Sequence, residues 1–150
     1  ETAYPLPTPH VEGAYNVSFS GLKTAVLNAV NRARQAGEEV DVPGMAASFQ
    51  WRITEILAEK LLAAARDTGA ARICIAGGVG ANEALRRKVQ QGAQALGAQV
   101  FLPQLSLCGD NAAMVAAQGY YEFLAGHTAH SNLNGLPTLG IDDESLDGPR

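Results

Sequence analysis

The stretch "RICIAGGVGANEALRRKVQQGAQALGAQVFL", residues 72–102, predicts the fold of this chain. Its first part, 72–76, is short, apolar and β-branched, which is typical of a buried strand. A glycine cluster ends that strand, and apolar residues then recur at helical spacing as far as Gly97. A second apolar run, 98–102, predicts another strand that ends at Pro103. The alternation of strand, helix and strand with short joins predicts a right-handed parallel unit of an α/β fold.

Long helices are expected on both sides of this unit. The segment 20–37 has apolar residues at helical spacing, with Ser20 placed to cap its start and Gly37 to end it. Residues 44–66 carry the longest apolar stripe and predict a long core helix. A final helix is expected over 113–124. The fold class is therefore α/β, with parallel βα units and long core helices.

Composition limits the classes of function. The chain has 150 residues, 47% of them hydrophobic, which is enough for one sizeable core. A formal charge of -4 argues against binding nucleic acid by charge alone. Two cysteines in apolar surroundings, Cys74 and Cys108, do not form a disulfide framework and fit a reducing cytoplasm. No run of about 18 apolar residues is present, so we expect no membrane span.

The ends of the chain differ in composition from its middle. Residues 1–15 contain three closely spaced prolines, which favour extended backbone and predict an entry or linker segment. Residues 16–126 hold the predicted helices and strands, and 127–150 form a polar tail. The chain does not open on Met, so we expect it to be a piece of a longer protein.

The glycine cluster is the first candidate site. Gly77, Gly78 and Gly80 can take positive φ, and without Cβ atoms they let a phosphate or sugar approach the backbone amides. The alternative is a tight strand-to-helix join. The stretch is not a dinucleotide fingerprint, because after Gly78-x-Gly80 the chain continues through Asn82 to Glu83, with no third small residue where the fingerprint needs one.

A second candidate follows the second predicted strand. Asp110 and Asn111 are placed at the start of the next helix, where either one caps the helix or the Asp110 carboxylate points at a cation. Nearby, Cys108 is interpreted as a buried structural thiol. Both loops are expected at the carboxyl ends of parallel strands, which is where ligands bind in such sheets.

Other polar residues have simpler interpretations. The spacing of His127 and His130 can serve a metal, but a polar tail more often makes a solvated turn there. The run 86–88, Arg-Arg-Lys, predicts a solvated helix face, with RNA contact as the alternative. Polar residues within 18–24 predict either a pocket wall or a plain helix start.

Four motifs together indicate a family. In this order and spacing, "SFSGLKTA", "GMAASFQ", "AGGVGANEALR" and "CGDNAAMVAAQG" resemble the TsaD family of tRNA threonylcarbamoyltransferases, formerly labelled O-sialoglycoprotein endopeptidases or glycoproteases. The resemblance runs from about Asn16 to Gly126. The smaller noncatalytic paralogue of the family is expected to lack the Cys-Gly-Asp-Asn cluster, so the catalytic branch is favoured.

The resemblance implies an actin-like, Hsp70-like sugar-kinase fold (ASKHA) of two lobes, of which this chain covers the C-terminal lobe. The family transfers threonylcarbamoyl from threonylcarbamoyl-AMP to N6 of the adenosine beside the anticodon. By family analogy, Asn82 contacts the adenylate and the loop of Gly77, Gly78 and Gly80 suits its nucleotide part. By the same analogy, Asp110 is a ligand of one iron or zinc ion. Neither Asn82 nor Asp110 is a plausible general base.

Departures from the family pattern limit these expectations. The paired metal histidines of the N-terminal lobe have no counterpart here, so we expect no transferase activity from this chain alone. Implied partners are tRNA, threonylcarbamoyl-AMP, the missing N-terminal lobe, the smaller paralogous subunit and the P-loop ATPase of the pathway. Dimerisation of the fragment is also expected, since an apolar face normally covered by the other lobe would be exposed. A metalloprotease and a noncatalytic interaction domain remain the alternative functions.

Overall fold

The computed structural model describes residues 3–129, 131 and 134–135. Along the chain, its regular elements are α1 (Ser20–Ala36), α2 (Val42–Thr68), β1 (Arg72–Cys74), the 3-10 helix η1 (Gly78–Ala81), α3 (Glu83–Ala95), β2 (Gln99–Phe101), the 3-10 helix η2 (Leu105–Leu107) and α4 (Ala112–Leu124). The chain divides into two compact units, Glu1–Gly109 and Asp110–Arg150. We describe each unit by itself.

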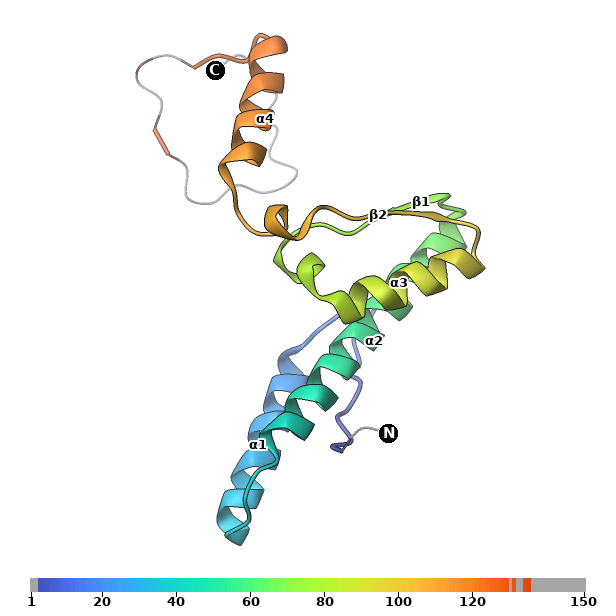
Figure 1. Ribbon diagram of the computed structural model, residues 1–150, viewed down its shortest axis with the longest axis vertical. Coiled ribbons are helices and arrows are strands. Elements are labelled where there is room, and N and C mark those ends of the chain that lie inside the picture. Colours follow the sequence, from blue (N-terminus) through green and yellow to red (C-terminus); the bar gives the residue numbers. More distant parts are fainter. Residues whose placement is uncertain (1–2, 130, 132–133, 136–150) are drawn as a thin grey trace. The chain divides into compact units, whose positions relative to one another are not determined.

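The centre of the first unit is a βαβ arrangement (Figure 1). β1 and β2 pair in parallel, with Ile73 opposite Val100, and α3 connects them. The predicted parallel α/β unit is thereby confirmed. Both strands are shorter than the predicted ranges 72–76 and 98–102.

The main core lies between this sheet and two helices. Its buried residues come from α2, β1, the residues after β1, and α3: Ala58, Ala65, Ile73, Ile75, Leu85, Val89 and Ala93. Gly92 brings α3 close to α2, because a Cβ at this position would overlap Cδ1 of Leu62. Close approach of the two helices therefore depends on the bare backbone at Gly92.

The predicted buried strand is buried on one face only in β1. Ile73 faces the core, whereas Arg72 and Cys74 are exposed. Successive side chains of a strand point to opposite faces, and the α2–α3 core covers only the face that holds Ile73. Cys74 is thus exposed rather than in the apolar surroundings that its sequence neighbours indicated.

α1 and the first half of α2 enclose a second cluster. Leu6, Leu22 and Met45 are its buried members, so the N-terminal segment contributes to it as well. The backbone N–H of Tyr4 also donates to Oγ of Ser48 at 3.1 Å. The segment before α1 therefore packs against α1 and α2 at Leu6 and Tyr4.

The helix ends largely follow the sequence signals. Gly37 ends α1 with φ 70°, as predicted. The predicted Ser20 cap is wrong by one position, because Phe19 stands at the cap position without a side-chain hydrogen bond and Ser20 is the first helical residue. Asp41 caps α2 by accepting the N–H of Gly44 at 2.9 Å.

One exposed contact links the N-terminal segment to the end of α2. The hydroxyl of Tyr15 donates to Oδ2 of Asp67 at 2.8 Å. This hydrogen bond raises the pKa of Tyr15 above its usual value of 10.0, because the carboxylate accepts from the protonated phenol.

In the second unit, α4 is the regular element of the described residues. Its predicted range is confirmed, but none of its side chains is buried. Within the described chain, no helix is both long and apolar enough to cross a bilayer.

Candidate functional site

The loop after β1 forms a tight turn that leads into α3. Gly77 has φ 78° and ψ 175°, and residues 78–81 form the single 3-10 turn η1. The N–H of Gly80 donates to the carbonyl of Gly77 at 2.9 Å, and the N–H of Asn82 donates to the carbonyl of Val79 at 3.0 Å. The chain therefore passes from strand to helix within a few residues.

Different structural constraints act at the three glycine positions of this loop. Gly77 needs positive φ, which side-chain-bearing residues rarely adopt. A Cβ at Gly80 would lie 3.2 Å from Cγ2 of Ile75, which follows β1, so packing against Ile75 favours a bare backbone there. Gly78 has neither constraint, since its φ is not positive and an added Cβ would meet nothing within 4 Å. The tight-join interpretation thus explains Gly77 and Gly80 but not Gly78.

Asn82 caps α3, a role that the sequence analysis did not assign to it. Its Oδ1 accepts the N–H of Leu85 at 3.1 Å. Its Nδ2 donates to Oε1 of Gln50 at 3.4 Å, which is long for an N–H···O hydrogen bond. The amide oxygen is therefore committed to the helix, while the amide nitrogen can exchange this partner at low cost. An Asn before Glu83 and a helical apolar pattern was the sequence signal for the cap.

Arg86 supports the loop from α3. Its Nε donates to the carbonyl of Gly80 at 2.5 Å, and its Nη2 donates to the carbonyl of Pro103 at 2.8 Å and to Sγ of Cys108 at 3.0 Å. Its side chain is half-buried. The prediction of a solvated face is therefore wrong for Arg86, because its acceptors come from loops distant in sequence. Cys108 is buried, as predicted.

The next two positions of the charged run behave differently from each other. Arg87 is exposed and lies 3.6 Å from Glu83, so it fits the predicted solvated face. Lys88 pairs with Oε2 of Glu55 at 2.6 Å and lies 5.0 Å from the ring centroid of Trp51. Each of these two cations therefore has an acidic partner, Glu83 for Arg87 and Glu55 for Lys88.

Asp110 begins the second compact unit and is exposed. Asn111, not Asp110, caps α4, since its Oδ1 accepts the N–H of Met114 at 3.0 Å. The predicted helix cap in the Asp110-Asn111 pair is therefore confirmed at Asn111 and not at Asp110. Both Asp and Asn are good caps, so sequence could not choose between them.

The described residues do not by themselves form a metal site. No group of three or more possible His, Cys, Asp or Glu ligands occurs among them. An iron or zinc site needs several donors, and Asp110 alone offers one carboxylate. His127 pairs with Oε2 of Glu122 at 2.7 Å, and His130 lies outside the described residues.

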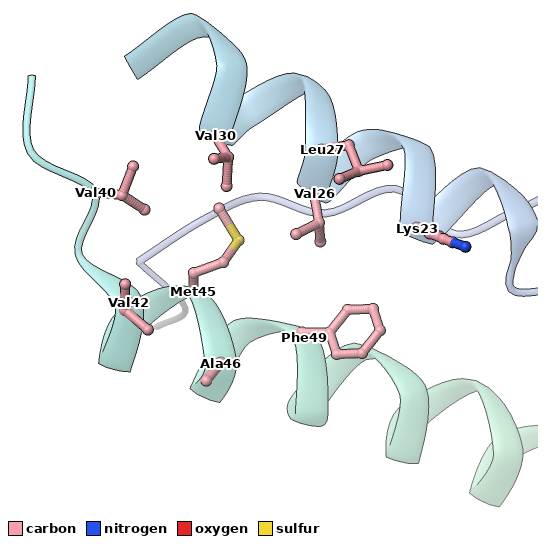
Figure 2. A pocket seen from close by; sticks show the side chains of 9 residues that line it. All are labelled: Lys23, Val26, Leu27, Val30, Val40, Val42, Met45, Ala46 and Phe49. Carbon is pink, nitrogen blue, oxygen red and sulfur yellow. The ribbon is translucent and has the colours of Figure 1, made fainter. Parts of the chain in front are cut away.

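An apolar groove of about 300 Å³ lies between α1 and the start of α2. Figure 2 shows Val26 of α1 and Met45 and Phe49 of α2 at this groove, with Lys23 at one side. Of the polar residues predicted within 18–24 as a pocket wall, Lys23 lines this groove, whereas Thr24 Oγ1 donates to the Ser20 carbonyl at 3.1 Å. Apart from Lys23, the lining residues are apolar, so the groove offers little that would orient a nucleotide.

Comparison with known proteins identifies the family. Residues 1–117 match the family model TsaD, tRNA N6-adenosine threonylcarbamoyltransferase. The chain belongs to this family. The matched range includes the glycine loop, Asn82 and Asp110.

Individual TsaD relatives agree. The tRNA N6-adenosine threonylcarbamoyltransferase of Clostridioides difficile is 45% identical over 131 residues, which are 87% of this chain and 39% of the relative. That of Moorella thermoacetica is 43% identical over 141 residues, 93% of this chain and 41% of the relative. That of Symbiobacterium thermophilum is 44% identical over 139 residues, which are 93% of this chain and 40% of the relative. The chain spans about two fifths of the length of these curated relatives.

Proposed function

We propose that this chain supplies the C-terminal, nucleotide-binding part of a transferase. The reaction moves threonylcarbamoyl from threonylcarbamoyl-AMP to N6 of the adenosine beside the anticodon of a tRNA. Two findings support this: membership of the TsaD family and the names of the curated relatives. The observation that carries the proposal is Gly78, whose bare backbone nothing in the fold requires.

The loop is suited to hold the adenylate. Backbone without Cβ atoms at Gly77 and Gly78 lets the ligand approach closely, and the N-terminus of α3 behind the loop favours a phosphate. Asn82 keeps its oxygen on the helix cap and turns its Nδ2 donor from Gln50 to an acceptor on the ligand. Gly80 shapes the turn by allowing contact with Ile75.

The candidate site residues bind and orient, and neither Asn82 nor Asp110 acts as a general base. The roles of the loop are to hold the AMP part and to fix the direction of the carbamoyl carbon. Such positioning makes the attack of the adenosine amine effectively intramolecular. The loop thereby favours transfer within the complex over loss of the activated group.

Asp110 is proposed as one carboxylate ligand of an iron or zinc ion whose other ligands lie outside the described residues. The described residues supply too few donors to hold that ion by themselves. Comparison of the metal content of Asp110→Ala and wild-type complete protein checks this assignment. Equal metal content in both would contradict it.

The larger assembly is proposed on the family resemblance. The chain is the C-terminal lobe of an ASKHA fold and acts in the cytoplasm with the N-terminal lobe. The partners are tRNA, the smaller paralogous subunit and the P-loop ATPase of the pathway, and the chain without the other lobe dimerises. Light scattering of the isolated chain, showing a monomer at high concentration, would contradict dimerisation.

Gly78→Ala in the complete gene product is the sharpest test of the function. The structure gives the added methyl open space at an ordinary φ, so stability should stay within about 0.5 kcal/mol of wild type. The methyl would occupy the space that the adenylate needs, and KM for threonylcarbamoyl-AMP should rise at least about tenfold. Gly119→Ala, which adds the same methyl in open space on α4, is the matched control.

The Asn82→Ser variant tests the helix-capping role of Asn82 separately from its proposed ligand contact, in the same assay. Serine caps helices about as well as asparagine, so stability should be kept, while the Nδ2 donor is lost and transfer falls. Wild-type transfer in both Gly78→Ala and Asn82→Ser would show that the loop is only a turn. The noncatalytic interaction domain would then be the better description.

A further inference from the structure

Arg86 joins the loops that follow both strands of the sheet. Its guanidinium reaches the carbonyl of Gly80 after β1, and the carbonyl of Pro103 and the thiol of Cys108 after β2. All of these residues belong to the first compact unit. One side chain from the first turns of α3 thus bonds three acceptors on two separate loops.

The geometry requires arginine. A guanidinium carries five N–H donors in a rigid planar fork, so it can hold acceptors in different directions at once. A lysine ammonium at the end of a flexible stem has the same charge without that fixed fork. Its acceptors are carbonyls and a thiol, and no acidic side chain of the described chain pairs with Arg86. The contacts therefore set loop positions rather than neutralise a charge.

The contact with Gly80 lies inside the turn that Gly77 begins. Gly80 also packs on Ile75, the residue after β1, and its carbonyl accepts from Arg86, so both residues hold Gly80 in place. Gly78, by contrast, has open space at its Cα. Arg86 thus fixes the frame of the loop and leaves its open position free for a ligand.

We propose that Arg86 is a positioning residue that keeps the Gly77–Asn82 loop in its ligand-binding shape by tying it to the Pro103–Cys108 segment. This inference rests on the proposed function for its ligand, threonylcarbamoyl-AMP, but its effect on the loop is independent of that ligand. Without the tie, the loop samples other shapes, and each binding event must order it again. Removal of Arg86 should therefore weaken the affinity for the adenylate more than it slows turnover of bound substrate.

The test compares Arg86→Lys and Arg86→Met with wild type in the complete gene product. Arg87→Met is the matched control, because Arg87 is the exposed neighbour on the same helix with only an i,i+4 pair to Glu83. Two quantities are measured: kcat and KM for threonylcarbamoyl-AMP, and hydrogen exchange of the amides of Gly78–Asn82 relative to those of the buried core of α2.

Both Arg86 variants should raise KM at least about tenfold with kcat changed less than about threefold. Exchange in the loop should accelerate by a similar factor, while the α2 core and the Arg87→Met protein stay at wild-type values. Lysine should not rescue, since it restores the charge without the fork.

Two results would overturn the inference. Wild-type KM and loop exchange in Arg86→Lys would show that charge alone matters. Faster exchange throughout the protein with an unchanged KM would show a general structural brace. If the wild-type gene product transfers no threonylcarbamoyl, the proposed function fails, and loop exchange still decides the role of Arg86.

Discussion

α3 and α4 are similar helices with opposite environments. Each has 13 residues, and each begins at an asparagine that accepts the N–H of the third helical residue, at 3.1 Å for Asn82 and 3.0 Å for Asn111. α3 buries Leu85, Val89 and Ala93, whereas α4 buries no side chain. The difference lies in what surrounds each helix, not in how each helix starts.

Helix formation and capping are local properties of α3 and α4, whereas the burial of their side chains is not. A helix and its cap depend on neighbouring residues, so both helices form where the sequence predicts them. Burial depends on partners, and α3 finds them in α2 and β1 of the same compact unit. In the described part of the second unit, α4 is accompanied by no strand and no other helix. Its exposed Val115, Tyr121 and Phe123 therefore follow from its setting.

The largest difference in stability between the two helices is expected on substitution of their third residues, Leu85 in α3 and Met114 in α4. Leu85 is 5% exposed in the main core, so Leu85→Ala should lower the free energy of unfolding by about 2–5 kcal/mol. Met114 is 53% exposed, so Met114→Ala should change it by less than about 0.5 kcal/mol. Urea unfolding followed by circular dichroism measures both. A loss at Met114 as large as that at Leu85 would show that α4 is covered in the folded protein.

A smaller effect is expected at the glycines within the helices. The methyl of Gly92→Ala would overlap Leu62, and this overpacking should cost about 1–3 kcal/mol. The methyl of Gly119→Ala meets nothing within 4 Å, and alanine favours a helix over glycine by about 1 kcal/mol, so this variant should be more stable.

Thermal unfolding of the two glycine variants gives the sign of each change. A Gly92→Ala protein as stable as wild type would mean that Leu62 moves aside without loss of packing. Destabilisation by Gly119→Ala would again indicate that a surface lies against α4.

Sequence was a good guide to the elements because their signals are local. The apolar spacing of 44–66 and the glycine after α1 depend on residues within one or two turns. The same reasoning failed where partners come from far along the chain. Nothing in the run Arg86-Arg87-Lys88 shows that the first residue reaches Pro103 and Cys108 while the second stays in solvent.

The candidate site shows the same limit. In sequence, Gly77, Gly78 and Gly80 are equivalent, and only the fold shows that packing against Ile75 favours glycine at Gly80 and that Gly78 is left without a structural reason. Likewise, Asp110 and Asn111 are both good caps, and the backbone conformation decides that Asn111 acts. The sequence predicts the candidate loop, and the structure shows which of its residues shape the turn and which caps the helix.

The smallest difference between the two helices is expected at their caps. Asn82→Ala and Asn111→Ala each remove the side-chain acceptor of a first-turn N–H, which typically costs about 1 kcal/mol. Because capping is local, the two losses should agree within about 0.5 kcal/mol, although one helix is buried and the other is exposed. Urea unfolding of both alanine variants and of the Asn82→Ser and Asn111→Ser controls measures these losses.

Serine should restore most of the stability, since its hydroxyl accepts the same N–H. A much larger loss at Asn82 that serine does not restore would assign the excess to the Nδ2 contact with Gln50, and the cap would then not be the main structural role of Asn82.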